Sequence, residues 1–532
     1  MRDQHRLSLA KVELPASHHV PYSRHVSPHI VNTEAGDYLQ VFRLQGLAFE
    51  TADDDDLNNW HERLNVTWRN VASAHVSLWT HLVRRRERVA LPGDAPEGFA
   101  GALHQKYMQR LAGQTLMLNE LYLSIVYRPF VGAATGALGT LLRMQRADRA
   151  AVVDLDDALD ACEKLAQTLI AALERYEPER LGIERRGERD FSAPVEFLSM
   201  LMNAERQMRP LPRAPIRDVL ATGRPLFGSE TIEYRSPTQT RFGAMLGIKE
   251  YPTPTTVGMY NALLTAPFEF VLTQSFTFLT KATGQGLLQR QYHRMSNAGD
   301  FAISQSEALK DALDALTANE FVMGDHHLSL QVLTEAIPAH AGDASTAMKQ
   351  LNDHIALART LLADCGMTVA REDLALEAAF WAQLPANFAL RPRKAPITSR
   401  NFAAMAPLHN HPVGRATGNH WGEALTLLIT SARSPYYFNL HASDPREPDG
   451  GSRKDTGHTF ICGPTGTGKT VVIGFLVSML HRKGVTQVVF DKDYGLEILV
   501  RALDGEYLAL RNGEPTASIH CNWIPRLRTS SS

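Results

Sequence analysis

Residues 459–480 read TFICGPTGTGKTVVIGFLVSML, and this stretch decides the fold of the region around it. The apolar segment 459–462 predicts a short strand, and VVIGFLVSML predicts an apolar helix. Between them, GPTGTGKT matches the pattern G-x-x-x-x-G-K-[ST] in the strand–loop–helix context that the pattern requires. The stretch therefore predicts a P-loop of a nucleotide triphosphatase. The alternative is a glycine-rich turn that carries a lysine by chance.

The residue types of this loop suit phosphate chemistry. Glycines allow backbone conformations that place several N–H groups around phosphate oxygens, and the following helix N-terminus adds partial positive charge. Lys469 would reach the β- and γ-phosphates, and the Thr470 hydroxyl would contact Mg²⁺. We expect a nucleoside triphosphate, ATP or GTP, to bind here together with Mg²⁺, through Gly463, Pro464, Thr465, Gly466, Thr467, Gly468, Lys469 and Thr470.

A second apolar segment, VTQVVFDKD at 485–493, predicts the next strand of a β–α–β unit. It ends in Asp491 and imitates a Walker B strand, although many P-loop ATPases carry Walker B on a later strand. Three interpretations stand for Asp491: it lines the nucleotide site, it binds Mg²⁺ or water, or it serves as a capping or ion-pair residue.

The region before the loop predicts a mixed α/β fold, because strand-like and helical periodicities alternate along it. Strands are expected at 37–48, 76–83, 119–128, 268–276 and 327–333, and helices at 54–72, 154–176, 304–319 and 343–363. The expected order is an irregular lead-in (1–36), an α/β subdomain (37–208), a Pro/Gly-rich boundary (209–256), a second α/β subdomain (257–390), a connector and start of the ATPase domain (391–456), the P-loop domain (457–516) and a tail (517–532).

Composition narrows the class of protein. With 55 Lys and Arg against 57 Asp and Glu, the net charge of −2 excludes a globally basic nucleic-acid binder. The four cysteines form no CxxC pair, so neither a disulfide framework nor a zinc site is indicated, and a reducing compartment fits. The best membrane-spanning candidate, 121–142, carries Arg128 and Pro129 and begins with strand-like alternation, so peripheral membrane contact is the expectation.

The weaker signals favour structural interpretations. The run DDDD at 53–56 is typical of a helix N-terminus, and RRRER at 84–88 of a solvated strand end or of a contact with a partner or a lipid surface. His409 and His411 have no nucleophile at a suggestive spacing. Histidines near the N-terminus read as a solvated segment: His5, His18, His19, His25 and His29. A basic stretch in the connector reads as domain packing or a phosphate contact: Arg391, Arg393, Lys394, Arg400 and Arg415.

Several longer stretches resemble the CagE/TrbE/VirB family of type IV secretion ATPases. The resemblance rests on NELYLSIVYRPF (119–130), 246–279, AAFWAQLPAN (378–387), 397–415, NHWGEALTLLIT (419–430), SPYYFNLH (434–441), 457–470 and 490–516. It spans about residues 37 to 516 and favours the VirB-type branch, the largest ATPase of the VirB set.

The resemblance implies an α/β N-terminal region followed by a RecA-like P-loop ATPase domain. It implies dimers or hexamers on the cytoplasmic face of a Gram-negative inner membrane. ATP hydrolysis would energise substrate transfer and pilus assembly in conjugation or effector delivery. The partners would be inner-membrane channel proteins and other secretion ATPases, and direct nucleic-acid binding is not expected.

The resemblance holds through GEPT (513–516), after which ASIHCNWIPRLRTSSS (517–532) resembles out-of-frame translation. We therefore expect an incomplete RecA-like domain without a Walker B acidic pair, catalytic glutamate or arginine finger. Such a chain should bind ATP weakly and hydrolyse little. Two other functions stay open: a nucleotide-independent docking subunit of the secretion complex, and a P-loop motor that translocates DNA.

Overall fold

The computed structural model describes residues 14–130, 153–297, 303–339, 343–419, 421–441 and 457–510. The chain divides into two compact units. Unit 1 comprises 1–88, 115–413 and 429–435, and unit 2 comprises 89–114, 414–428 and 436–532. The predicted tail at 517–532, GEPT at 513–516 and His5 lie outside the described residues.

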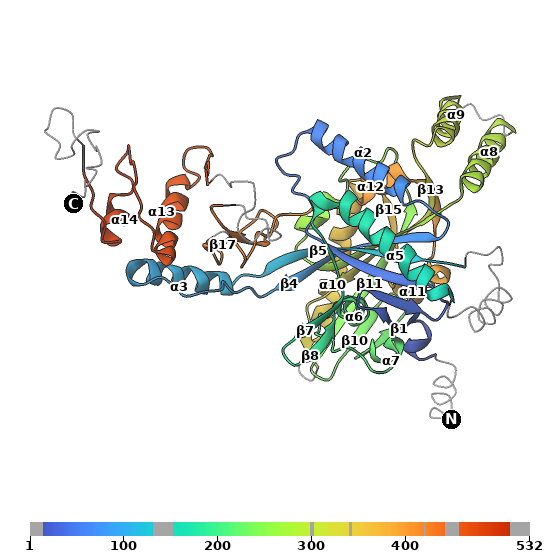
Figure 1. The fold of residues 1–532 in the computed structure, drawn as a ribbon, viewed down its shortest axis with the longest axis horizontal. Helices are drawn as coiled ribbons and strands as arrows, with labels where there is room; N and C mark the ends of the chain where they lie inside the picture. The colour runs from blue at the N-terminus through green and yellow to red at the C-terminus, as the bar shows by residue number, and fades with distance from the viewer. Residues whose placement is uncertain are drawn as a thin grey trace, which may run out of the picture. The chain divides into compact units, whose positions relative to one another are not determined.

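Unit 1 is built on one large sheet of 14 strands, in which the described pairings are antiparallel (Figure 1). Its main path runs β1 (Tyr22–Ser27), β2 (Ile30–Thr33), β3 (Tyr38–Leu44), β5 (Leu116–Tyr127), β4 (Val76–Glu87), β12 (Glu269–Phe278), β13 (Met323–Leu333), β11 (Gln239–Glu250), β10 (Ile232–Arg235) and β9 (Arg224–Phe227). Short strands extend it: β6 (Pro178–Arg180), β14 (Ile337–Pro338), β15 (Thr368–Arg371) and β16 (Ala395–Thr398). A separate hairpin joins β7 (Ile183–Arg186) to β8 (Arg189–Ser192).

Side chains alternate between the two faces of this sheet, as the pleat of a strand requires. On β4, Trp79 and Val83 enter one core while Val76 and Leu78 enter another. The first core is shared with α6 (Ala193–Asn203), α7 (Ile216–Val219) and α11 (Leu376–Trp381). The opposite face carries α2 (Asp54–Asn70), α5 (Val153–Ala172) and α12 (Ser399–Met405) over one half and α10 (Ala344–Ala363) over the other. Both faces are thus covered, which explains the long apolar strands.

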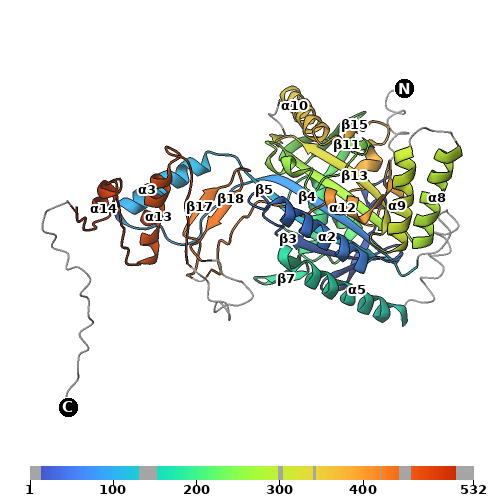
Figure 2. The same ribbon diagram turned by 90° about the horizontal axis from the view of Figure 1, so that it is seen from above.

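A helical hairpin is inserted between β12 and β13. Its helices are α8 (Lys281–Asn297) and α9 (Ile303–Thr317), which lie side by side in both views (Figures 1 and 2). Leu288 and Leu316 pack with Phe321 and Met323 in a small core at the base of the hairpin.

Unit 2 contains α3 (Gly98–Ala112), most of β17 (Thr426–Ile429), β18 (Pro435–Phe438), α13 (Lys469–Leu480) and α14 (Glu497–Ala502). Its core joins Leu103 of α3 to Leu425, Leu476 and Met479. Tyr107 packs on Phe475 of α13, with ring centroids 4.7 Å apart. The chain between β4 and β5 therefore helps to support the helix that follows the glycine loop.

The predicted α/β class and the predicted helices of unit 1 are confirmed, with Asp53 capping α2 through the backbone N–H of Asp56. The boundary predicted at 209–256 differs from the structure, because β9, β10 and β11 lie there and the sheet is continuous through it. The lead-in predicted at 1–36 likewise contains β1 and β2. Residues 121–127 of the membrane-spanning candidate belong to β5, and 131–142 lie outside the described residues. No described helix has both the length and the apolar composition needed to cross a bilayer.

The strands predicted at 459–462 and 485–493 are wrong, since neither segment is a strand in the described structure. Phe460, Val488 and Phe490 are 89%, 77% and 96% exposed. Parallel strands are stable when both faces are covered, and these segments have no such cover among the described residues of unit 2. Apolar composition alone was therefore insufficient to make strands here.

Candidate functional site

The glycine loop 463–470 stands at the N-terminus of α13, where the sequence placed it. Gly466 and Gly468 have φ angles of +84° and +91°, which side chains other than glycine adopt reluctantly. Gly468 is the N-cap of α13, and Lys469 is the first residue of the helix. The loop residues from Gly463 to Thr467 are exposed. Backbone N–H groups of a helix N-terminus are therefore accessible to an anion.

The Lys469 ammonium group folds back over this loop. Its Nζ donates to the carbonyl oxygens of Gly463 and Pro464, both at 2.8 Å. The Thr467 hydroxyl also donates to Pro464 O, at 2.7 Å. The cation is thus held at the loop by neutral acceptors, which leaves its charge available to an anionic ligand.

Thr470 supplies a hydroxyl oxygen in the loop, and Asp491 lies four residues before a segment that contacts Thr470. A Cβ at Gly495 would lie 3.4 Å from Thr470 Cγ2, so the segment after Asp491 contacts the first turn of α13. Asp491 Oδ2 accepts from Leu496 N at 2.8 Å and from Tyr507 Oη at 3.4 Å. The Thr470 hydroxyl has no hydrogen-bond partner in the described part of the chain. A hydroxyl and a carboxylate are donors of the kind that Mg²⁺ prefers, so the residue types fit this ion.

Contacts inside unit 2 fix the position of α13. A Cβ at Gly474 would lie 2.9 Å from Leu499 Cδ2, so α13 and α14 approach closely. At its other end, Arg482 donates to the carbonyl oxygens of Pro92, Asp94, Ala424 and Leu425. The middle and the C-terminal end of α13 are therefore held by packing that the sequence motif did not reveal.

The arginine run at 84–88 differs from the solvated strand end that its sequence suggested. Arg84 is 1% exposed, and its guanidinium donates to Ala266 O, Asn119 Oδ1 and Ala432 O at 2.5, 2.7 and 2.9 Å. Burial lowers the pKa of Arg84 to about 10. It therefore joins β4 to three distant segments as a structural cation.

The basic stretch of the connector also has mostly internal partners. Arg391 is 8% exposed and donates to the hydroxyl groups of Ser275 and Thr277. Three further basic residues of the stretch form ion pairs with carboxylates: Arg393 with Glu372, Lys394 with Asp325, and Arg400 with Glu62 and Glu320. This agrees with the packing interpretation rather than with a phosphate-binding patch.

Several histidines of unit 1 pack against other residues, whereas His18 is exposed, as the solvated interpretation predicted. His25 Nε2 lies 2.8 Å from Ser192 Oγ, and the His19 ring stacks on Trp381 with ring centroids 4.8 Å apart. Burial lowers the pKa of His409 to about 4, and its ring contacts Asn261. His411 contacts Glu50. Across the described residues, no group of three or more His, Cys, Asp or Glu side chains could hold a metal ion.

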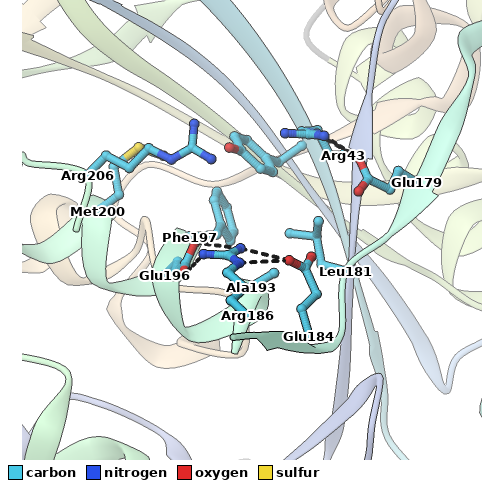
Figure 3. A pocket seen from close by; sticks show the side chains of 11 residues that line it. Arg43, Glu179, Leu181, Glu184, Arg186, Ala193, Glu196, Phe197, Met200 and Arg206 are labelled. Carbon is cyan, nitrogen blue, oxygen red and sulfur yellow. Dashed lines mark hydrogen bonds and ion pairs between the residues drawn. The ribbon is translucent and has the colours of Figure 1, made fainter. Parts of the chain in front are cut away.

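A charged cavity of about 160 Å³ lies in unit 1 between β6, β7 and α6 (Figure 3). The stacked rings of Tyr122 and Phe197 are among its lining residues. Each arginine at this cavity has a carboxylate partner: Arg43 with Glu179, Arg186 with Glu184 and Glu196, and Arg206 with Glu120. Burial alone would raise the pKa of Glu120, but the hydrogen bond and charge of Arg85 outweigh it and lower the pKa. The charges are thus compensated internally, and the cavity is a poor site for an anion.

Comparison with known proteins identifies two regions of this chain. Residues 29–134 match a family model described as the type IV secretion system ATPase VirB4/TrbE, N-terminal domain. Residues 179–393 match the CagE, TrbE, VirB family, component of type IV transporter system. The glycine loop lies outside both matched ranges.

Curated relatives match nearly the whole chain. It is 41% identical over 510 residues to the type IV secretion system protein virB4 of Bartonella henselae, covering 96% of this chain and 62% of that protein. It is 37% identical over 520 residues to PtlC of Bordetella pertussis, covering 96% and 61%. It is 37% identical over 510 residues to virB4 of Brucella suis, covering 93% and 60%. The chain thus spans about three-fifths of the length of these relatives. Residues 29–134 and 179–393 thus match family models of type IV secretion system components, and most of the chain is similar to curated type IV secretion system proteins.

Proposed function

We propose that this chain is the ATP-binding component of a type IV secretion machine, in which ATP hydrolysis energises substrate transfer and pilus assembly. The observation that carries the proposal is the exposed glycine loop at the N-terminus of α13, where the Lys469 ammonium donates to the loop carbonyls of Gly463 and Pro464. The family match of residues 29–134 supports the same function, since the matched model is described as that of an ATPase.

The chemistry follows from the residues of the loop. Loop N–H groups and the helix dipole bind the phosphates. Lys469 exchanges the carbonyl oxygens of Gly463 and Pro464 for phosphate oxygens, which are charged acceptors and hence stronger ones. The Thr470 hydroxyl would hold Mg²⁺, with the Asp491 carboxylate as a further candidate ligand, and the ion would offset phosphate charge.

We further propose dimers or hexamers that contact inner-membrane channel proteins and other secretion ATPases. The chain would act peripherally on the cytoplasmic face of the inner membrane. Relatives named as type IV secretion proteins support this assignment.

A nucleotide-independent docking role is the second candidate. It is favoured by the contrast between the covered sheet of unit 1 and the exposed apolar side chains of 457–510, such as Phe490 and Ile498 at 96% and 86% exposure. A poorly supported loop segment would position metal and water loosely and hydrolyse slowly.

Titration of the full chain with a fluorescent ATP analogue, with and without Mg²⁺, tests the two roles. We expect Lys469→Ala to weaken binding by roughly tenfold or more, because a charge-assisted contact to phosphate is lost. Lys106→Ala on α3 is the matched control, since Lys106 is an exposed lysine of the same unit. Equal binding by wild type and Lys469→Ala would refute nucleotide recognition by the loop. Absence of binding in both would favour the docking role.

A further inference from the structure

A groove of about 590 Å³ opens in unit 1 beside α8, remote in sequence from the glycine loop. One wall is α8, and the other comprises β16, the start of α12 and the segment 251–255. Both walls belong to unit 1, and α8 lies at the end of the sheet beside α9 (Figure 2). Its volume is in the range typical of ligand and peptide pockets.

One stripe of α8 faces this groove. Leu287, Arg290, Gln291 and Arg294 all line it, and their spacing of i, i+3, i+4 and i+7 places them on one helix face. A different part of α8 packs in the core of the hairpin, because a Cβ added at Gly284 would contact Leu316 and Met323. The stripe is thus not needed for packing α8 against α9.

The two arginines of the stripe lack partners. Neither Arg290 nor Arg294 makes an ion pair or hydrogen bond to a described residue, and the residues that line the groove include no acidic side chain. Like charges one helical turn apart repel each other. The cavity between β6, β7 and α6 differs in this respect, because each of its arginines forms an ion pair with a carboxylate. The groove therefore complements an anionic ligand.

The floor of the groove is apolar and recessed. Leu288, Met323 and Met405 are 9%, 6% and 1% exposed. Membrane insertion requires apolar side chains that project into the bilayer, whereas these can be reached only by a side chain that enters the groove. The floor therefore favours a protein segment with an apolar anchor over a lipid surface.

The wall opposite α8 is rigid and closed to strand addition. Thr398 and Asn401 form the capping box of α12, and Asn401 Nδ2 donates to Thr255 Oγ1 at 2.8 Å. On β16, Pro396 has no N–H group, and the Thr398 N–H already donates to Asn401 Oδ1. A partner must therefore bind through its side chains rather than as an added strand.

We propose that this groove docks a partner protein through a segment that carries two carboxylates about one helical turn apart beside an apolar anchor residue. The carboxylates pair with Arg290 and Arg294, which are separated by about 6 Å along the helix axis. The anchor side chain packs between Leu287 and Ile397. The site is independent of nucleotide binding.

The test uses the full chain and fluorescence anisotropy. The probe is a fluorescein-labelled amphipathic peptide in which glutamates four positions apart flank leucines, and the comparison peptide has lysines in place of the glutamates. The groove variant, Arg290→Glu/Arg294→Glu, reverses the charge of the groove. Lys349→Glu/Arg359→Glu, at exposed positions of α10 without ion pairs in the described structure, makes the same change of net charge elsewhere.

We expect the glutamate peptide to bind wild type and to lose roughly tenfold or more in affinity with the groove variant, while the α10 control stays within about twofold. The lysine peptide should gain affinity for the groove variant. Leu287→Ser should weaken the glutamate peptide without a gain for the lysine peptide. Equal binding by the groove variant and wild type would overturn the proposal.

Flotation of the full chain with vesicles that contain phosphatidylglycerol tests whether the occupant of the groove is a lipid surface instead of a protein segment. The proposal is wrong if wild type floats with the vesicles, Arg290→Glu/Arg294→Glu does not, and both proteins bind each peptide equally. In that case the occupant of the groove is a lipid surface. Circular dichroism of each variant verifies that folding is unchanged.

Discussion

Replacement of Arg84 tests whether the buried arginine of β4 supports the fold of unit 1. Arg84 donates to Ala266 O, Asn119 Oδ1 and Ala432 O, and no carboxylate pairs with it in the described structure. Arg84→Ala removes all three hydrogen bonds and leaves buried acceptors without donors. It also leaves a cavity in a close-packed region.

The magnitude follows from two opposed effects. Hydrogen bonds to a charged group contribute about 1.5–3 kcal/mol each, so three of them contribute at least about 4.5 kcal/mol. The lowering of the Arg84 pKa from 12.5 to about 10 by burial corresponds to about 3 kcal/mol against the charged form. The difference is at least about 1.5 kcal/mol, and the cavity adds to it. We therefore expect Arg84→Ala to lower the free energy of unfolding by about 3 kcal/mol.

Guanidinium unfolding, followed by the fluorescence of the tryptophans, measures this change. Trp68, Trp79 and Trp381 are buried in unit 1 and report its transition. Arg88→Ala is the control, because Arg88 belongs to the same basic run but is exposed; it should stay within about 0.5 kcal/mol of wild type. A loss below about 1 kcal/mol for Arg84→Ala would refute the structural role.

Three further predictions concern other packing contacts. A Cβ at Gly324 would lie 2.5 Å from Phe276, so Gly324→Ala should lower the unfolding free energy by about 1–3 kcal/mol; a neutral result in the same denaturation assay would contradict it. A Cβ at Gly474 would lie 2.9 Å from Leu499 Cδ2, so Gly474→Ala should displace the Leu499 side chain where α13 meets α14 and weaken binding of the fluorescent ATP analogue; unchanged affinity would show that this contact does not support the loop. Burial lowers the pKa of His81, His326 and His409 to about 4, 3 and 4. Because the unfolded chain takes up these protons below about pH 6.5, stability is full above that pH and is lost as pH falls toward 4. We expect about 1–2 kcal/mol per histidine at pH 5, and equal stability at pH 7.5 and 5 would contradict this.

Periodicity predicted those elements of unit 1 whose own sequence sets the buried face. In α2 and α10 the buried positions recur at helical spacing, and the helices form where expected. The glycine loop was predictable for the same reason, because its geometry depends on local glycines and the following helix. Local sequence was sufficient in both cases.

Long-range contacts set the features that were missed. Arg84 looks solvated in sequence, but its acceptors come from residues up to 348 positions away. The Pro/Gly-rich stretch 209–256 forms strands because β11 pairs with β10, β13 and β15. The helix α3 was not predicted, although Leu103, Tyr107 and Leu111 have helical spacing that could have indicated it.

The two strands predicted beside the glycine loop show why an apolar segment does not by itself specify a strand. In unit 1, β12 is mostly apolar on one face, nearly all of its residues are buried, and it has β4 and β13 as hydrogen-bonded neighbours, with helices over both faces. Residues 485–493 have similar composition, yet Val488 and Phe490 are exposed and no ladder forms in the described structure. Ordering an extended backbone costs about 1–2 kcal/mol per residue, and apolar burial offsets this only where a covering layer exists. The same apolar pattern therefore forms a strand in unit 1 and an unpaired segment in unit 2.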